Sequence, residues 1–159
     1  EPGIGAVEER VAIHSPPICG GLQVVGSIAN PQFRLDTNRG DRTYRIGQDR
    51  LSFRVTPDRR GVVKVAVINS DGTVTQPEAW ARMAGQPGQP LRFGEAEGGF
   101  PLDPPAGQMM LIAVVSSNPL FSRPRPEEEQ ADTFFAALRD ALARAPDAQT
   151  AFAVIDTVQ

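Results

Sequence analysis

The sequence of 159 residues contains a single cysteine, Cys19, and a single histidine, His14. One cysteine cannot form an intrachain disulfide, which excludes the class of small secreted proteins that depend on disulfides for stability. One histidine and one cysteine are also too few to form a zinc site by themselves. Neither a disulfide framework nor zinc therefore explains how this chain is held together.

Long apolar segments and clusters of positive charge are also missing. The longest apolar run, residues 109–115, has the length of a buried strand and is too short to cross a membrane as a helix. The formal net charge is -3 and the Lys and Arg residues form no block, which argues against binding to nucleic acid or to an anionic membrane. The chain begins at Glu1 and not at Met, so we expect a processed or trimmed protein, or one domain of a larger chain.

Proline and glycine are abundant, with 15 of each, and this composition favours many short strands joined by defined turns. Residues 51–56 alternate apolar and polar side chains, which is typical of a strand with one buried face. Residues 62–68 are almost all β-branched and carry Lys64 as their only charge, so we predict a strand covered on both faces. The turn signals at 57–61 and 69–72 bound this second strand.

The remaining segments predict further strands and one helix. Residues 127–145 begin with three glutamates and then space apolar side chains three and four apart, which predicts a long helix with one apolar stripe. Residues 1–21 show no regular period and contain Pro and Gly pairs, so we predict an N-terminal strap or linker. Further strands are expected at 22–29, 33–37, 73–75, 91–93, 109–115 and about 151–158.

Together these elements predict a mainly β fold, in which residues 22–159 form a single β-rich domain. We expect a β-sandwich with one long C-terminal helix packed against it. The apolar positions of the periodic segments should form the core: Leu35, Leu51, Phe53, Val55, Val63, Val65, Val67, Leu111, Ala113, Val115, Phe134, Leu138, Phe152 and Val154.

Candidate functional residues are few. His14 and Cys19 lie five positions apart in a segment rich in Pro and Gly, where no rigid scaffold would hold a Cys-His catalytic pair. The aspartates fit turns and no calcium-binding spacing, and the glycine clusters lack the Lys-Ser or Lys-Thr of a phosphate loop. We therefore predict no catalytic, cofactor-binding or metal-binding residue.

The irregular stretch 77–105 carries aromatic side chains that stand apart in the sequence. Long loops often carry binding residues, and aromatic anchors contribute much of the energy of protein interfaces. Trp80, Phe93 and Phe100 are therefore candidate contacts to a partner. The alternative is that these aromatics only fix the loop to the core of the domain.

From about residue 33 to about residue 121 the chain resembles the bacterial family called domain of unknown function 4384. The order and spacing of several short motifs carry the resemblance: Ile46-Gly47-Gln48, the strand 51–55, Asp58-Arg59-Arg60-Gly61, the strand ending at Ile68, Asp71-Gly72-Thr73-Val74, Met83-Ala84-Gly85, Pro90-Leu91, Pro105-Ala106-Gly107 and Ser116-Ser117-Asn118-Pro119-Leu120. The resemblance implies an accessory β-sandwich domain. It also implies neighbours such as caspase-like peptidase or serine/threonine kinase domains in envelope or signalling proteins, and no established catalytic residues.

We therefore expect a non-catalytic interaction or regulatory module of a bacterial envelope or signalling protein, without a cofactor. Its partner would be another protein or a neighbouring domain. The alternative is a stand-alone periplasmic protein that binds a small ligand, or a peptide added as a strand to a sheet edge.

Overall fold

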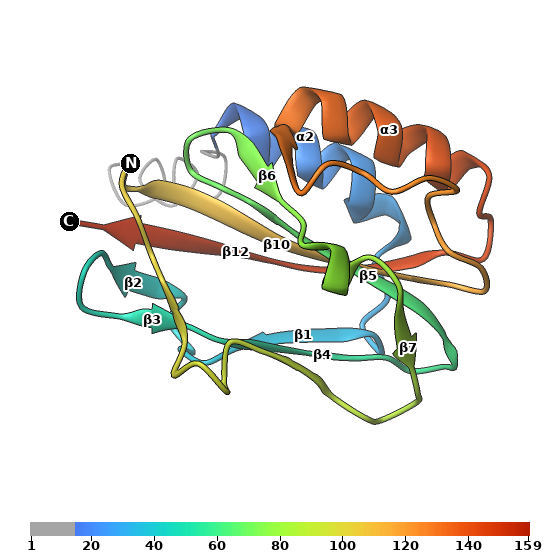
Figure 1. The fold of residues 1–159 in the computed structure, drawn as a ribbon, viewed down its shortest axis with the longest axis horizontal. Helices are drawn as coiled ribbons and strands as arrows, with labels where there is room; N and C mark the ends of the chain where they lie inside the picture. Colours follow the sequence, from blue (N-terminus) through green and yellow to red (C-terminus); the bar gives the residue numbers. More distant parts are fainter. Residues whose placement is uncertain (1–14) are drawn as a thin grey trace, which may run out of the picture.

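The computed structural model describes residues 15–159, which build three layers (Figure 1). The middle layer is a sheet of seven strands: β2 (Thr43–Arg45), β5 (Gly61–Ile68), β6 (Thr73–Thr75), β7 (Met83–Gly85), β10 (Gly107–Ser116), β11 (Glu128–Gln130) and β12 (Gln149–Val158). One face is covered by a three-stranded sheet of β1 (Arg34–Thr37), β4 (Phe53–Thr56) and β8 (Leu91–Phe93). The other face is covered by the helices α2 (Pro16–Val25) and α3 (Ala131–Ala143).

Short elements complete the described chain. The strands β3 (Arg50–Leu51) and β9 (Phe100–Pro101) pair with each other as a two-stranded sheet. Single 3-10 turns form η1 (Gly26–Ile28) and η2 (Glu78–Trp80). The prediction of a mainly β fold is confirmed by this set of strands and sheets.

Strand β10 lies at the centre of the seven-stranded sheet. It pairs antiparallel with β5, where Val115 lies opposite Val63, and antiparallel with β12, where Ala113 lies opposite Ala151. Beyond β12, the early strand β2 adds in parallel, with Tyr44 opposite Thr157. The sheet therefore joins segments from both halves of the sequence, and its most apolar strand is protected on both edges.

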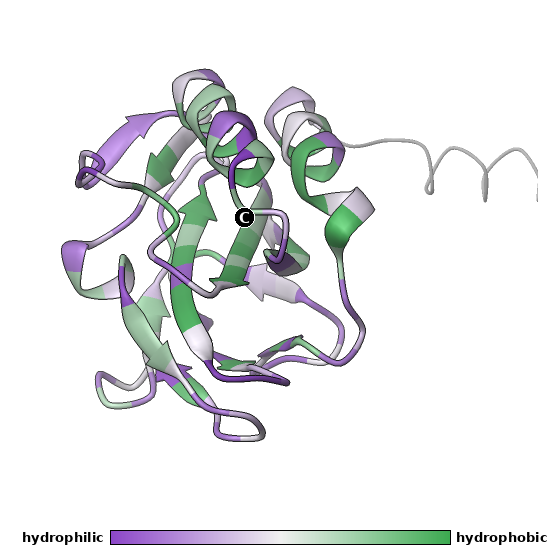
Figure 2. Ribbon diagram, turned by 90° about the vertical axis from the view of Figure 1, so that its right-hand side faces the viewer, coloured by the Kyte–Doolittle hydropathy of each residue, from purple (hydrophilic) through white to green (hydrophobic). Residues whose placement is uncertain are grey.

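The two faces of the middle sheet bury two separate cores. Side chains such as Val65 and Leu111 point to the three-stranded sheet and pack with Phe53 and Val55. The alternate positions, such as Ile68 and Ile112, pack beneath the helices. In Figure 2 the hydrophobic colour accordingly gathers on the central strands and on the helices above them, and the peripheral loops are mostly hydrophilic.

Most of the predicted core is confirmed, with one error in the last strand. Twelve of the fourteen predicted positions are buried, from Leu35 to Leu138, whereas Phe152 and Val154 are only partly buried. In β12 the buried apolar positions are Ala151, Ala153 and Ile155, and Thr150 and Thr157 are buried as well. The small residues on that face allow the three-stranded sheet to approach closely, and the larger ones meet the helix layer at its margin.

The predicted strand at 22–29 is wrong, because residues 16–25 form helix α2 and residues 26–28 form η1. The predicted strap at 1–21 ends inside this helix, and its first 14 residues lie outside the described part of the chain. Pro16 and Pro17 occupy the first positions of α2, where a helix tolerates proline because those N–H groups have no acceptor within the helix.

The glycine pair that suggested a break in fact lets α2 pack closely. A Cβ atom added at Gly21 would lie 2.7 Å from the sulfur of Met110 and 3.2 Å from Cζ of Phe135. Gly21 is buried between the central strand and helix α3. Glycine here therefore serves helix packing, a use that local propensity cannot reveal.

The predicted long C-terminal helix is also corrected. Helix α3 has 13 residues, and the glutamate-rich segment before it forms strand β11, which pairs with β6. Phe134 and Leu138 lie on the buried face of α3, so the predicted apolar stripe is confirmed. The negative charges thus belong to an edge strand of the sheet and not to the first turn of a longer helix.

The docking of α2 yields a direct test. Ile18 is fully buried in the helix-side core, so we expect Ile18→Ala to lower the free energy of unfolding by about 2–5 kcal/mol. The exposed Gln23 of the same helix is the matched control, and Gln23→Ala should change the free energy of unfolding by less than about 0.5 kcal/mol. Urea unfolding followed by circular dichroism measures both. Equal stability of the two variants would show that α2 is not part of the folded core.

Candidate functional site

The three predicted contact residues come together in one aromatic cluster. Phe93 of β8 stacks on Phe53 with ring centroids 4.7 Å apart. Trp80 at the end of η2 meets the Phe93 ring edge-on at 5.2 Å, and Phe100 of β9 lies 5.8 Å from Trp80. Edge and stacked arrangements of this kind are the favourable geometries for aromatic pairs. The long irregular stretch therefore places its aromatics side by side.

Only part of this cluster reaches the surface. Phe93 is 4% exposed and belongs to the core between the sheets, whereas Trp80 and Phe100 are partly buried and pack against that core. They line a surface hollow of about 670 Å³, together with Met83 and Arg92. The alternative role of the aromatics, fixing the loop to the core, thus applies most fully to Phe93. That Trp80 and Phe100 contact a partner stays a prediction.

A glycine-rich loop forms one rim of this aromatic hollow. Gly94 and Gly99 have φ angles of +84° and +100°, and the Gly99 N–H donates to the Gly94 carbonyl at 2.6 Å. A Cβ at Gly99 would lie 2.6 Å from Cβ of Arg50. The loop is closed by its own backbone and packed tightly against β3, so it presents Glu95 and Glu97 from a defined position.

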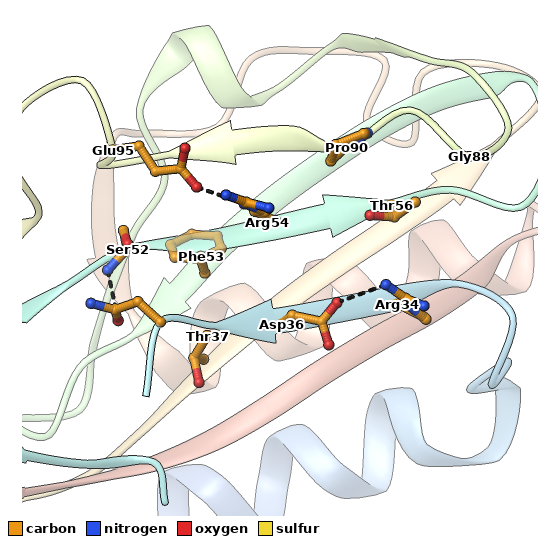
Figure 3. Close-up of a pocket in the computed structure, with 11 residues that line it drawn as sticks. Arg34, Asp36, Thr37, Ser52, Phe53, Arg54, Thr56, Gly88, Pro90 and Glu95 are labelled. Carbon is orange, nitrogen blue, oxygen red and sulfur yellow. Dashed lines mark hydrogen bonds and ion pairs between the residues drawn. The ribbon is translucent and has the colours of Figure 1, made fainter. Parts of the chain in front are cut away.

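The outer face of the three-stranded sheet is polar and adjoins the aromatic hollow. Figure 3 shows Arg54 reaching Glu95 and Arg34 reaching Asp36 across this face. Glu95 accepts from Arg54 at 2.6 Å and from Arg92 at 3.1 Å. The hydrogen bond from Arg54 is the main cause that holds the pKa of Glu95 below its ordinary value, so this carboxylate stays charged at neutral pH.

Glu95 connects two hollows of the surface. It lines the aromatic hollow and also the polar hollow of about 350 Å³ on the sheet face, which includes Arg54 and Ser52. Aromatic anchors, fixed charges and a rigid loop are thus continuous over one side of the domain. Such a surface can bind an apolar side chain and fix its orientation by charge.

A second site, which the sequence did not suggest, surrounds Lys64 of β5. Lys64 points to the helix side of the sheet, is 5% exposed, and lines a pocket of about 390 Å³ beside η2. Its ammonium lies 5.4 Å from the centre of the Phe121 ring, and the guanidinium of Arg125 lies 5.7 Å from the same centre. Within residues 15–159, no carboxylate pairs with Lys64 at ion-pair distance.

The charges around Lys64 only partly balance. Glu129 is the nearby carboxylate, but it accepts from Arg125 and from the Gln76 side chain. Burial lowers the pKa of Lys64 to about 8, Glu129 opposes this change, and Arg125 adds to it. The sequence contains one indication of this site, which is that Lys64 is the only charge in a strand predicted to be buried on both faces.

The remaining candidates from the sequence are Cys19, His14 and the acidic side chains. Cys19 lies half-buried in α2, and His14 lies outside the described residues. Within residues 15–159, no group of three His, Cys, Asp or Glu side chains is placed to hold a metal ion. Among the helices that the structure describes, none is long and apolar enough to cross a membrane.

Comparison with known families bears on residues 43–119, which match the model of a domain of unknown function. This family is DUF4384, and residues 43–119 are called the DUF4384 segment below. The resemblance predicted from the sequence motifs is therefore confirmed over β2 to β10. Among curated proteins, none matches the chain at a significant level.

The DUF4384 segment contains Lys64 and all three aromatic candidates, but it is not the whole fold. Helix α2, strand β1, helix α3 and strand β12 lie outside it. The segment that carries Phe121 and Arg125 also follows its end. The aromatic hollow is thus built from DUF4384 residues, whereas the Lys64 pocket combines them with residues beyond the match.

The buried charge of the DUF4384 segment gives a stability prediction. We expect Lys64→Met to raise the free energy of unfolding at pH 7 by on the order of 1–3 kcal/mol, because methionine fills a similar volume without a charge to desolvate. Urea titrations of the two proteins measure the difference. A less stable variant would show that the ammonium contributes more attraction than its burial costs.

The pH dependence of the free energy of unfolding distinguishes the cost of burying the Lys64 charge from an effect of side-chain packing. Lys64 titrates near pH 8 in the folded protein and near 10.5 when unfolded, so between these values the unfolded chain binds more protons. The free energy of unfolding of the wild type should therefore rise with pH across this window, relative to Lys64→Met. The advantage of the variant at pH 7 should shrink accordingly by pH 10.5. If the difference in free energy of unfolding between the two proteins stayed the same from pH 7 to pH 10.5, the lowered pKa of Lys64 would be contradicted.

Proposed function

We propose that this chain is a non-catalytic interaction or regulatory module that binds a protein partner. The observation that carries the proposal is the side-by-side position of Trp80 and Phe100 in the aromatic hollow, next to the charged sheet face. Half-buried aromatic side chains of this kind are the usual anchors of protein interfaces. The resemblance in sequence motifs supports the same class of function, because it implies an accessory domain.

The rigidity of the surface supports binding. Trp80 and Phe100 are held by contacts with Phe53 and Phe93, so little side-chain freedom remains to be lost on association. The glycine-rich loop that carries Glu95 and Glu97 is likewise closed by a backbone hydrogen bond. A partner side chain can thus enter a hollow whose walls are already in place.

The charges beside the hollow can set the orientation of the partner. Glu95 is shared by Arg54 and Arg92, and Glu97 lies on the opposite part of the loop without an ion pair among the described residues. A partner segment with an apolar residue next to a basic one fits this arrangement. Such a partner would be a neighbouring domain or protein of a bacterial envelope or signalling system, as the resemblance implies.

Site-specific photo-crosslinking tests this proposal. A crosslinking amino acid at the exposed Ala96 of the rim should yield a discrete protein adduct in cells that make the native gene product. The matched control is the exposed Ala136 on helix α3, which should yield no such adduct. Adding Glu97→Arg should reduce the Ala96 adduct several-fold, because it reverses the rim charge. The same adducts from both positions, or none from Ala96, would contradict the proposal.

A further inference from the structure

The positive charge of Lys64 is buried without an ion pair among residues 15–159, and it faces a pocket. The Lys64 side chain extends from strand β5 and lines the pocket, and the residue is more than nine-tenths buried. A charged group at such depth is costly unless it is paired. Within residues 15–159, the Lys64 ammonium lies 5.4 Å from the centre of the Phe121 ring and forms no ion pair, although the charge of Glu129 acts on it from further away.

Further positive charge surrounds the same pocket. Arg82, Arg123 and Arg125 line it together with Lys64, and Glu78 is the only carboxylate in the lining. Arg125 forms an ion pair with Glu129. Among residues 15–159, Arg82 donates only to the backbone carbonyl of Phe121, at 3.4 Å. The pocket therefore has an excess of unpaired donors over acceptors.

The rest of the lining is apolar and small. Ala79 and Ala81 come from η2 and its end, and Phe121 supplies the aromatic wall. The volume of about 390 Å³ is within the range of small-molecule sites. Cationic donors beside an aromatic wall are suited to a ligand with an anionic head and a flat or apolar body.

We propose that this pocket binds a small molecule whose carboxylate or phosphate group pairs with Lys64 and Arg82 and whose apolar part packs on Phe121. Carboxylate and phosphate oxygens both accept hydrogen bonds from lysine and arginine, so the pocket chemistry is shared by the two groups. Binding would supply an anionic partner at ion-pair distance, which Lys64 does not have among residues 15–159. A buried charge lowers the stability of the fold, and its presence is explained if Lys64 serves to bind the ligand.

This pocket is distinct from the aromatic hollow. Trp80 packs toward the core between the two sheets, whereas Ala79 and Ala81, its neighbours in the chain, line the Lys64 pocket on the other side. The inference therefore does not depend on the proposed protein partner. Crosslinking at Ala96 and ligand binding at Lys64 can fail independently.

The test uses four probes added to the chain of 159 residues: phenyl phosphate, inorganic phosphate, benzoate and neutral benzyl alcohol. Binding is followed by amide chemical shifts in NMR and by the melting temperature. Phenyl phosphate or benzoate should shift the amides of the Lys64 pocket and raise the melting temperature. Inorganic phosphate should bind more weakly than phenyl phosphate because it has no group to pack on Phe121. Preference between phenyl phosphate and benzoate then identifies the anionic head.

Two variants that each remove one positive charge make the result specific. Lys64→Met should weaken binding of the preferred anion at least about tenfold, which is the loss expected for one charge-assisted contact. The control is Arg60→Met, at an exposed turn outside the pocket lining, which should bind like the wild type. Circular dichroism verifies that both variants are folded.

Three outcomes would overturn the proposal. The first is that Lys64→Met and Arg60→Met bind the anion equally well. The second is that benzyl alcohol shifts the same amides as strongly as phenyl phosphate does. The third is that neither anion with an aromatic body perturbs the pocket of the wild type.

Discussion

The burial of strand β10 on both faces is the constraint on which the other layers depend. From Met109 to Ser116 every residue of β10 is buried, so each face of the middle sheet must be covered by something apolar. The three-stranded sheet covers one face and the two helices cover the other. Lys64 of β5 lies opposite Val114 of β10. The same constraint therefore places an ammonium group among apolar side chains.

Strands with strong local patterns could be predicted, and elements defined by distant contacts could not. The β-branched run before Ile68 and the apolar run after Met109 allow few other structures, and both form central strands. Helix α2 was missed because Pro16 and Gly21 act as breakers in isolation. Only the position of Met110 shows why glycine is required there. The pairing of β2 with β12 spans most of the chain and leaves no local signal.

The two candidate sites illustrate the same limit. Aromatic side chains in an irregular stretch attract attention, and Trp80 and Phe100 indeed lie together. The residues around Lys64 come from β5, from η2 and the residues just after it, and from the segment before β11, so their grouping exists only in the folded chain. A lone charge in a strand expected to be buried on both faces was visible in the sequence, but its surroundings were not. The turn η2 separates the two sites, with Trp80 toward one and Ala79 toward the other.

The position of β12 has a consequence for how the protein is made. This strand follows both β2 and β10 in the sequence, yet it lies between them in the sheet. While the ribosome is still synthesising residues 149–158, β2 has no place to pair and one edge of β10 stays open. An apolar strand with a free edge is prone to pair with other chains. The nascent chain therefore passes through a period of aggregation risk that ends only when β12 emerges.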